Sequence, residues 1–551
     1  MRRVLELHLV LLLVGLTGSS AVRGGDDTWK ATGSQAAVAT GSVESADAAL
    51  AVLQGGGNAV DAAVAAMLVL SVTDPQNFCF GGEVPLLVYD SGRKTVEVIC
   101  GQGVAPRLAT VAYFQQHHEG RIPASGHPVT AAVPGALDAL LTSLDRYGTK
   151  TFAELAAPTL AILDQRSDGW QPQLASRIRR LIEAEQQGGG DRRRGLRLAA
   201  DCFYRGPIAR ELDAWSRTHG GLIRYVDLAT HVTRIEEPVA IDYRGYTIYK
   251  CGAWTQGPYL LETLRLLEKF DVRSLRHNTG PYIHLLTESL KLGLADRDTY
   301  YADPLFVRVP LDGLLSQEYA DLRRPLIDLT RASFDLRPGD PPGKRALLDV
   351  APADYLVPAE PVHDTTTCLV ADRWGNVVAA TPSGWGGVMA GETGILLGSR
   401  LRSLNTWSGH PNCIEPGKRP RITLTPTLVF RDGRPVAAIS VAGGDQQDQV
   451  TLQLLLSRLE FGLDPARAVT APRFVTDHLV GSFNQTPPQL GSLTLYETFA
   501  ADAVADLRER GHHVTFKKPP LGHPVMLTID PESGRKTAAG DPVARRHARA
   551  Y

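Results

Sequence analysis

Apolar and polar positions follow two different periods along this chain, and each change of period marks a new element. Across residues 41–71 the apolar residues recur at helical spacing, which predicts two helices separated by the glycines at 55–57. We expect Ser45 to cap the first helix and Asn58 the second, because short polar side chains accept the unpaired amides of a first turn. Asp61 then falls in the first turn of the second helix, where the helix dipole favours a carboxylate. One face of that helix should be buried and carries Val60, Val64, Met67, Leu68 and Ser71.

Short apolar runs bounded by turn residues predict strands. Residues 86–89 and 96–100 flank a Ser-Gly pair and form one predicted hairpin. Residues 365–383 contain two β-rich runs joined by the turn 373–376, which ends in Gly-Asn and predicts a second hairpin. Later elements are expected as strands at 428–430 and 437–441 and as a helix at 450–461.

The other segments are mainly helical or irregular. Residues 136–240 have mostly helical periodicity, interrupted by the Gly- and Arg-rich stretch 188–195, and we expect the arginines 192–194 to lie in a solvated loop. Two more helices are predicted within 259–300. Residues 338–358 are rich in Pro, Asp and Gly, which is typical of an exposed, mobile segment. Strands and helices thus alternate irregularly with hairpins, a pattern that suits an α+β fold with helices layered on an antiparallel double sheet.

The charge balance and the N-terminus bear on where the protein works. Lys and Arg number 58 and Asp and Glu 59, so the net charge of −1 gives no argument for binding nucleic acid or a membrane surface. Arg2-Arg3, the apolar run 9–16 and the small residues 17–21 follow the order of a secretory signal peptide over residues 1–21. No stretch is long and apolar enough to predict a membrane span. We expect an exported protein, periplasmic or extracellular, with a cytoplasmic protein that has a disordered N-terminus as the alternative.

Neither the cysteines nor the histidines form a metal-binding pattern. The six cysteines are widely spaced and contain no C-x-x-C pair; export would permit disulfides, but the spacing leaves their pairing open. Cys368 lies inside an apolar strand and is expected to be a buried free thiol. The pairs His117-His118 and His512-His513 are expected on the surface, so we predict no metal and no cofactor. Neither Gly-x-Ser-x-Gly nor a P-loop motif occurs.

Three consecutive threonines, 365–367, open the second predicted hairpin. One hypothesis is a core hairpin that begins with polar residues. The other is that the chain is cut between Asp364 and Thr365, which would put a hydroxyl nucleophile and a free α-amine on one residue. An α-amine has a pKa of about 7.7–8.0, so it can accept the proton of the hydroxyl near neutral pH without a histidine.

Several stretches, in order along the chain, carry a family resemblance. Thr365-Thr366, followed by Asp372 and Gly375-Asn376, resembles the start of the small subunit of γ-glutamyltransferases, N-terminal-nucleophile hydrolases that are made as one self-cleaving chain. Residues 54–63, with 73–76 behind them, are similar to the large-subunit opening of that family. The resemblance runs from about residue 33 to the C-terminus. Weaker matches lie at 133–135, 243–246, 295–297 and 303–304.

The resemblance implies the αββα sandwich of N-terminal-nucleophile hydrolases, with two stacked, mainly antiparallel sheets between helical layers. It also implies a large subunit, residues 22–364, and a small subunit, residues 365–551, that form one intertwined domain as a heterodimer of the chain's own cleavage products. Gly443-Gly444 matches the family's glycine pair, whose amides stabilise the oxyanion, and Ser383 matches a hydroxyl residue that supports the nucleophile. Without the resemblance, the glycine pair would predict a strand-ending turn and Ser383 an ordinary turn residue.

The expected substrate pocket departs from the family. Gln102 stands where the family has an arginine for the glutamyl carboxylate. Arg402 and Ser403 stand where it has acidic residues for the α-amine. Thr423 remains at one position of the family's serine pair, and Asp445 follows the glycine pair. Both charge partners of a zwitterionic glutamyl group are therefore missing, which removes strong, geometry-specific contacts.

The catalytic set is thus kept and the recognition set is changed. We expect a self-processing amide hydrolase or acyltransferase that acts on a small-molecule amide or peptide through an acyl-enzyme. The departures argue against a γ-glutamyl donor, so an acylase for a non-glutamyl acyl group is the close alternative, and a non-catalytic binding module with the same fold is the alternative of another class. The segments 381–391 and 403–418 are several residues shorter than the family pattern, which predicts a site that is open to water.

Overall fold

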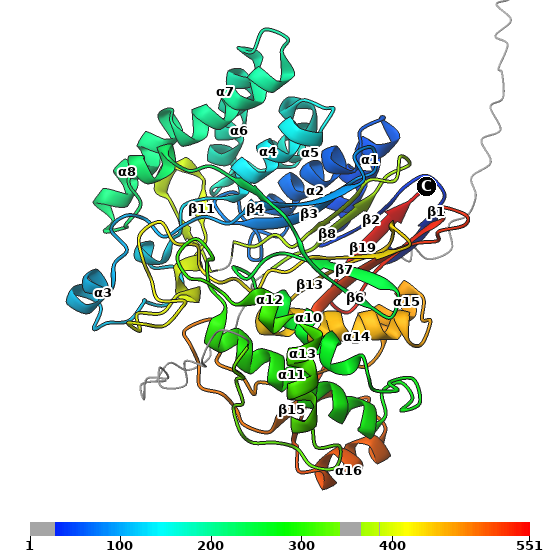
Figure 1. Ribbon diagram of the computed structural model, residues 1–551. Helices are drawn as coiled ribbons and strands as arrows, with labels where there is room; N and C mark the ends of the chain where they lie inside the picture. Colours follow the sequence, from blue (N-terminus) through cyan, green and yellow to red (C-terminus); the bar gives the residue numbers. More distant parts are fainter. Residues whose placement is uncertain (1–27, 342–364, 385) are drawn as a thin grey trace, which may run out of the picture.

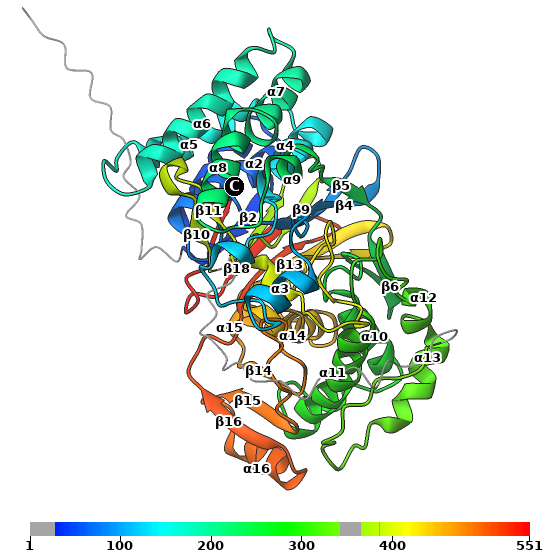
Figure 2. The ribbon, with the colours of Figure 1, turned by 90° about the vertical axis from the view of Figure 1, so that its left-hand side faces the viewer.

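The computed structural model describes residues 28–341, 365–384 and 386–551. Two sheets lie face to face between two layers of helices, as Figures 1 and 2 show. The predicted α+β fold of αββα type is confirmed. The expected signal peptide, residues 1–21, lies outside the described residues, as do Asp364 and most of the Pro-, Asp- and Gly-rich segment before it.

The first sheet contains seven antiparallel strands and both hairpins that the sequence predicts. In spatial order these are β19 (His547–Ala550), β2 (Ala37–Thr40), β8 (Cys368–Ala371), β9 (Val377–Ala380), β3 (Val84–Asp90), β4 (Thr95–Gly101) and β5 (Arg234–Glu236). The hairpin of β8 and β9 pairs Leu369 with Ala379 and lies at the centre of the sheet. Strands from before and after the predicted cleavage site therefore belong to one sheet.

The second sheet also contains seven antiparallel strands, and it pairs an early strand of the described chain with a late one. In spatial order these are β1 (Lys30–Gly33), β18 (Lys536–Gly540), β17 (His523–Ile529), β13 (Arg434–Ala442), β12 (Thr427–Arg431), β7 (Tyr246–Lys250) and β6 (Val239–Tyr243). The pairing of β12 with β13 shifts register between Val429 and Phe430, which marks a bulge. The predicted strands 428–430 and 437–441 are confirmed within β12 and β13.

The side chains of the central strands alternate between two apolar layers. In β8, Leu369 and Ala371 belong to the core between the sheets, whereas Cys368 and Val370 belong to the core under the helices. Burial on both faces explains why this strand is an unbroken apolar run in the sequence. All six cysteines are free thiols, and Cys368 is buried as expected.

Helices α1 (Val43–Gln54) and α2 (Ala59–Thr73) pack on the first sheet, and both begin with complete capping boxes. The cap of α1 is Ser42 and not the expected Ser45, which lies inside the first turn and whose hydroxyl accepts a hydrogen bond from the Ser42 amide. Asn58 caps α2 as predicted, and Asp61 accepts from the Asn58 amide at 2.9 Å. The prediction of one buried face was too narrow, because α2 is buried on all sides by the sheet and by further helices.

These further helices form an outer layer, drawn in cyan to green at the top of Figure 1. They are α4 (Ala136–Tyr147), α5 (Phe152–Leu163), α6 (Gln171–Gln186), α7 (Arg192–Tyr204), α8 (Pro207–Thr218) and α9 (Tyr225–Ala229). The arginines 192–194 open α7 and do not lie in the expected loop, because Asp191 caps that helix by accepting from Arg194 N at 3.0 Å. Helix α3 (Val111–His117) stands to one side in Figure 1, and a short hairpin is made by β10 (Val388–Met389) and β11 (Leu396–Leu397).

The second sheet is covered by helices on its outer face, drawn in green and orange in Figure 1. These are α10 (Pro258–Leu267), α11 (Gly280–Tyr300), α14 (Gln447–Leu459) and α15 (Pro465–Thr470), with the smaller α12 (Leu311–Leu314), α13 (Gln317–Arg323) and α16 (Ala501–Glu509) nearby. A third sheet lies beyond them and consists of β14 (Phe474–Val475), β15 (Ser492–Tyr496) and β16 (His513–Lys517). Within the described residues, none of the helices combines the length and the apolar character that crossing a bilayer requires.

Candidate active site

Thr365 lies three residues before the start of β8 and is almost completely buried, with 1% of its surface exposed. It faces Ser383 in an isolated antiparallel bridge, and the next amide, Thr366 N, donates to Pro382 O at 2.9 Å. The register of β8 with β9 thus continues past the ends of both strands and holds the two residues opposite each other. The sequence singled out Thr365 and Ser383 separately, and the structure brings them together.

Gln447, the first residue of α14, reaches the hydroxyl of Thr365. Its side-chain amide lies 3.3 Å from Thr365 Oγ1. The remaining contacts select the orientation of the amide: Nε2 donates to the carbonyl oxygens of Thr423 at 2.9 Å and Val441 at 3.0 Å, which leaves Oε1 to accept from Thr365. Gln447 therefore fixes the direction of this hydroxyl. Sequence reasoning assigned Gln447 no role, although its place shortly after the glycine pair was a usable signal.

The glycine pair lies between β13 and α14. Gly443 has a φ of 129° and Gly444 a φ of 58°, which are conformations that residues with a Cβ atom rarely adopt. Gly444 opens a short 3-10 helix, Gly444–Gln446, that leads directly into α14. Amides at a helix N-terminus have no partner within the helix and favour negative charge. The pair is thus both a strand-ending turn and the start of a helix, and Gln447 connects it to Thr365.

The main-chain carbonyl of Thr365 is held by Arg546, from the C-terminal segment. Arg546 Nη2 donates to Thr365 O at 3.3 Å, and Arg546 Nη1 lies 3.7 Å from the carboxylate of Asp74. Burial lowers the pKa of Arg546, and the charge of Asp74 opposes that shift. The stretch 73–76, which carries part of the family resemblance, therefore reaches the site through Asp74. Sequence reasoning missed Arg546.

Ser383 also contacts a buried ion pair that the sequence did not predict. Arg400 Nη2 donates to Ser383 Oγ at 2.7 Å and lies 2.6 Å from the carboxylate of Glu83. The backbones of Glu83 and Ser383 exchange two hydrogen bonds of 2.8 Å. Burial raises the pKa of Glu83, while Arg400 and Ser383 favour the ionised carboxylate. The charge of Arg400 is thus balanced inside the protein by Glu83.

Arg402 and Ser403 lie on the same short 3-10 turn as Arg400, and both are buried. Arg402 Nε donates to Asn484 Oδ1 at 2.8 Å, and its guanidinium also contacts the hydroxyl of Ser125. Arg402 lines a polar cavity of about 210 Å³. Ser403 Oγ lies 3.5 Å from Arg400, so both predicted residues lie beside the Arg400 network.

Thr423 and Gln102 have different positions relative to Thr365. The carbonyl of Thr423 contacts Gln447, and its buried hydroxyl has no hydrogen-bond partner among the described residues. Gln102 is also buried, but its Nε2 donates to Gly103 O at 2.8 Å and it lines a cavity of about 810 Å³. Among the described residues, the wall of that cavity includes neither Thr365 nor Ser383. The structure therefore gathers Thr423 at the Thr365 site and places Gln102 in a different cavity.

Asp445 makes its contacts within the protein. Its Oδ1 lies 2.5 Å from Arg297 Nη1, and its Oδ2 accepts from Ser482 N at 2.9 Å. Burial alone would raise the pKa of Asp445, but Arg297 and Ser482 together hold that pKa below its usual range. Arg297 belongs to the matched motif 295–297, so this motif anchors the loop that carries the glycine pair.

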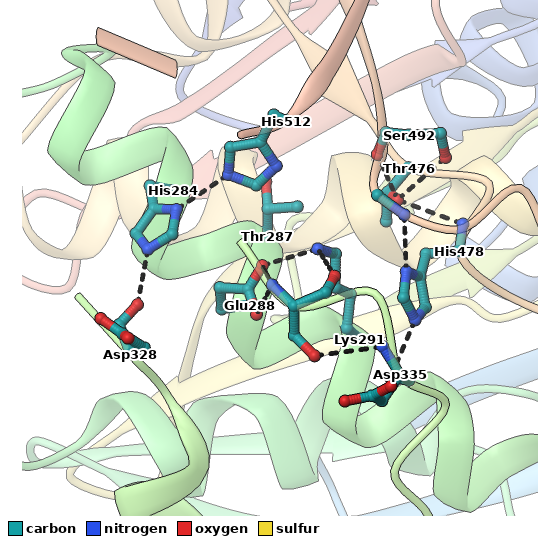
Figure 3. Close-up of polar contacts among 12 residues, drawn as sticks. His284, Thr287, Glu288, Lys291, Asp328, Asp335, Thr476, His478, Ser492 and His512 are labelled. Carbon is teal, nitrogen blue, oxygen red and sulfur yellow. Dashed lines mark hydrogen bonds and ion pairs between the residues drawn. The ribbon is translucent and has the colours of Figure 1, made fainter. Parts of the chain in front are cut away.

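One group of three side chains among the described residues has the spacing of a cation site. His284 and Glu288 lie on one face of α11, and His512 faces them, with all ligand atoms within 4.8 Å of one another (Figure 3). The carboxylate is already engaged, because Lys291 Nζ lies 2.6 Å from Glu288 Oε1 and Arg337 Nη2 lies 3.1 Å from Oε2. Two cations at one carboxylate disfavour a third, so the group does not fit a metal ion.

The two imidazoles instead form a buried hydrogen-bonded chain. His284 Nδ1 lies 2.8 Å from His512 Nε2, and His284 Nε2 lies 2.7 Å from the carbonyl oxygen of Asp328 (Figure 3). Burial lowers the pKa of both histidines, that of His512 to about 2. His512 was predicted on the surface and is buried instead, because the turn after α16 folds back onto α11. His513 and His117 are exposed as predicted.

Comparison with known proteins decides the family. The sequence model of the family described as Gamma-glutamyltranspeptidase matches residues 45–165 and 170–551. This chain belongs to the gamma-glutamyltranspeptidase family. It is 30% identical over 525 residues to the glutathione hydrolase proenzyme of Bacillus subtilis strain 168, an alignment that covers 89% of this chain and 87% of the relative. The resemblance found in the sequence is thereby confirmed.

Two solved structures extend the comparison. LmbA2991HD is 36% identical with a TM-score of 0.86, over 95% of this chain and 99% of that chain. The cephalosporin acylase from Bacillus halodurans is 25% identical with a TM-score of 0.80, over 98% of this chain and 99% of that chain. This member of the gamma-glutamyltranspeptidase family is therefore similar both to a glutathione hydrolase and to an acylase, and it is an N-terminal-nucleophile hydrolase.

Proposed function

We propose that this protein is a self-processing amide hydrolase or acyltransferase whose nucleophile is Thr365, freed by cleavage of the bond between Asp364 and Thr365. One observation carries the proposal: the hydroxyl of Thr365 is oriented by Gln447, opposite Ser383, at the start of a helix opened by the glycine pair. Relatives at this level of identity are proenzymes, which supports maturation into a heterodimer of residues 22–364 and 365–551.

Self-cleavage uses the hydroxyl that catalysis later uses. Thr365 Oγ attacks the carbonyl carbon of Asp364, and the proton of the hydroxyl ends on the departing nitrogen of Thr365. The C–N bond breaks as the ester bond forms, and water then hydrolyses the ester. The chain that begins at Thr365 now has a free α-amine, whose pKa of about 7.7–8.0 suits a general base.

In the mature protein the α-amine of Thr365 accepts the hydroxyl proton while Oγ attacks the substrate amide. The tetrahedral oxyanion needs preorganised donors, and the amides of Gly443 and Gly444 are proposed to supply them. Collapse of this intermediate expels the amine, which takes up the proton, and leaves an ester on Thr365. Water resolves the ester in hydrolysis, and a second amine resolves it in transfer.

The other side chains of the site hold the nucleophile in place. Arg546 fixes the Thr365 carbonyl, and the pair of Glu83 and Arg400 fixes Ser383. A misplaced hydroxyl lowers the rate of acylation sharply, because attack requires the oxygen to lie close to the carbonyl carbon in the right direction. These contacts are therefore positioning interactions, and the one cation that touches Ser383, Arg400, is already paired with Glu83.

A γ-glutamyl donor is expected to be a poor substrate. A charge-assisted hydrogen bond is worth roughly 1.5–3 kcal/mol, so losing the partners of both the carboxylate and the α-amine costs on the order of 3–6 kcal/mol. That corresponds to about a hundredfold to ten-thousandfold in kcat/KM. The test is kcat/KM for a γ-glutamyl anilide beside glutaryl and simple acyl anilides. A preference for the γ-glutamyl anilide above about tenfold, which is 1.4 kcal/mol, would refute the charge argument.

We further propose that the protein is exported, on the strength of the signal-like order of residues 1–21. Expression of the full chain in a bacterial host, followed by fractionation and N-terminal sequencing, tests this. Export predicts a mature large subunit that begins near residue 22 outside the cytoplasm. An intact Met1 in the cytoplasmic fraction would contradict it.

A further inference from the structure

A largely apolar cavity of about 550 Å³ lies beside the Thr365 site. Its walls include Ser71 at the end of α2, Leu174 in α6, and the hairpin of β10 and β11, where Met389 pairs with Leu396. The volume lies within the range of about 300–1,000 Å³ that is typical of small-molecule sites. The residues described above as contacting Thr365, namely Ser383, Gln447 and Arg546, are not part of its wall.

Two of the segments that hold Thr365 continue into the wall of the cavity. Beyond Ser383, the carbonyl of Gly384 accepts a weak hydrogen bond from the thiol of Cys79 at 3.5 Å, and Cys79 lines the cavity. From the other side, Asp74 faces the arginine that holds the Thr365 carbonyl, and the next two residues, 75 and 76, are wall residues. The wall therefore starts next to two residues that border the Thr365 site, Gly384 and Asp74, and among the described residues it includes neither Thr365 nor Ser383.

The wall contains no charged side chain among the described residues. Its polar side chains are Ser71, Gln76 and Ser125, and the thiol of Cys79 stays neutral because burial raises its pKa. The guanidinium of Arg402 lies behind Ser125 and is turned to Asn484. A carboxylate or an ammonium group would lose its hydration here without gaining an opposite charge. An uncharged apolar group would gain from leaving water.

We propose that this cavity binds the acyl group of the substrate, and that this acyl group is bulky, apolar and uncharged, such as an arylacetyl group or a medium-length aliphatic chain. The proposal rests on the proposed function, because it assumes that Thr365 carries the acyl group. The acyl group, unlike the amine, stays on Thr365 through both half-reactions. A half-open apolar cavity that borders the site of the nucleophile therefore serves the acyl group better than the departing amine.

The first test varies the acyl chain at a constant leaving group. Burial of one methylene group corresponds to roughly a fourfold gain in affinity, so kcat/KM should rise steeply from acetyl to octanoyl p-nitroanilide. The phenylacetyl compound should exceed both the glutaryl and the γ-glutamyl compound by more than about tenfold. A slope of less than about 1.5-fold per methylene, or a preference that follows the amine instead of the acyl group, would overturn the proposal.

The second test changes the wall. Met389 is a half-buried wall residue, so the larger side chain of Met389→Trp can fill part of the cavity without displacing buried core residues. The ratio of kcat/KM for octanoyl over acetyl anilide should fall about tenfold or more in this variant, and Met389→Leu should keep it within about threefold. Leu322→Trp, at a position that is 67% exposed on α13, is the matched control and should leave the ratio unchanged. Equal ratios in Met389→Trp and the control would refute the assignment of the cavity.

A binding measurement separates this proposal from the proposed function. Calorimetric titration of octanamide, an uncharged probe, into the uncut Thr365→Ala protein should show saturable binding, because the cavity is present in the uncut chain. Met389→Trp in that background should weaken binding about tenfold or more. If the probe binds but the wild-type chain turns over no anilide, the proposed function is refuted, whereas the proposal that the cavity binds an uncharged apolar group is retained. Turnover without binding or chain-length preference would overturn the cavity assignment alone.

Discussion

Arg297 Nη1 lies 2.5 Å from Oδ1 of Asp445, and this ion pair joins helix α11 to the loop that carries the glycine pair. Arg297 is fully buried and also pairs with Asp298 at 2.7 Å. A residue of the predicted large subunit thus holds the glycine-pair loop of the predicted small subunit. A loop fixed from a separate helix is preorganised, which is the condition under which amide donors stabilise a developing charge most.

Replacing Asp445 by Asn should therefore destabilise the protein. Breaking a buried ion pair by removing one partner costs about 3–5 kcal/mol, and we expect the lower end because Asp298 remains beside Arg297. Urea unfolding of the full chain measures the loss, and Asp432→Asn, at a side chain that is 91% exposed, is the control. An unchanged unfolding free energy with a raised KM for substrates that carry a free α-amine would instead make Asp445 a substrate ligand, the role suggested by its position in the sequence.

Gln447→Leu should lower kcat by about tenfold with little change in KM, because one neutral hydrogen bond to the nucleophile, worth about 0.5–1.5 kcal/mol, is lost. Gln453→Leu is the matched control, since that buried amide in the same helix bonds to the backbone of Phe474 and does not contact Thr365. Both variants should lose stability, and only the first should lose turnover. Equal kcat values in the two variants would remove Gln447 from the catalytic set.

The buried histidine pair predicts that stability falls in mild acid. The pKa values of His284 and His512 are lowered in the folded protein, so the unfolded chain binds more protons below its own histidine pKa of about 6.5. The free energy of unfolding therefore decreases as pH falls below about 6.5, by up to roughly 2 kcal/mol at pH 5 for an imidazole that stays neutral, such as His512. His512→Asn should flatten this dependence between pH 7 and pH 5. The same slope in the variant and the wild type would show that other groups cause it.

Hydrolysis should dominate over transfer. The segment 403–418 is shorter than the family pattern and is folded on itself, with a bridge between Asn405 and Cys413 and a hydrogen bond from Asn412 to the carbonyl of Ser403. Thr365 is 1% exposed in the uncut chain, and after cleavage we expect a site without a long covering loop to admit water, which then competes with the acceptor amine. Product analysis with and without glycylglycine measures the partition. A majority of transfer product at millimolar acceptor would contradict an open site.

Local sequence was sufficient for those parts of the fold that short-range chemistry decides. The hairpin 365–383 followed from its Gly-Asn turn, and the start of α2 followed from Asn58 and Asp61. Of the central pair, Thr365 was singled out by the run of three threonines and supported by the family resemblance, and Ser383 was found through that resemblance alone. The two residues lie face to face past the ends of β8 and β9 because the hairpin register continues there.

Contacts between residues that are far apart along the chain could not be predicted from the sequence. Glu83 and Arg400 are separated by 317 positions, and neither a single glutamate nor a single arginine in a sequence indicates its partner. Arg546 likewise reaches Thr365 from the last strand region, and the burial of His512 depends on how α16 packs against α11. Propensity and spacing describe neighbours along the chain, whereas these residues are defined by neighbours across the core.

The intact mass of the purified protein tests the central claim most directly. The wild-type chain should give two species, one that ends at Asp364 and one that comprises residues 365–551, and Thr365→Ser should give the same pair more slowly because it keeps a hydroxyl. Thr365→Ala should give a single uncut chain, because it removes the attacking oxygen. A fragment that begins at residue 365 in the Thr365→Ala protein, or a wild-type protein that stays uncut and inactive, would contradict the account.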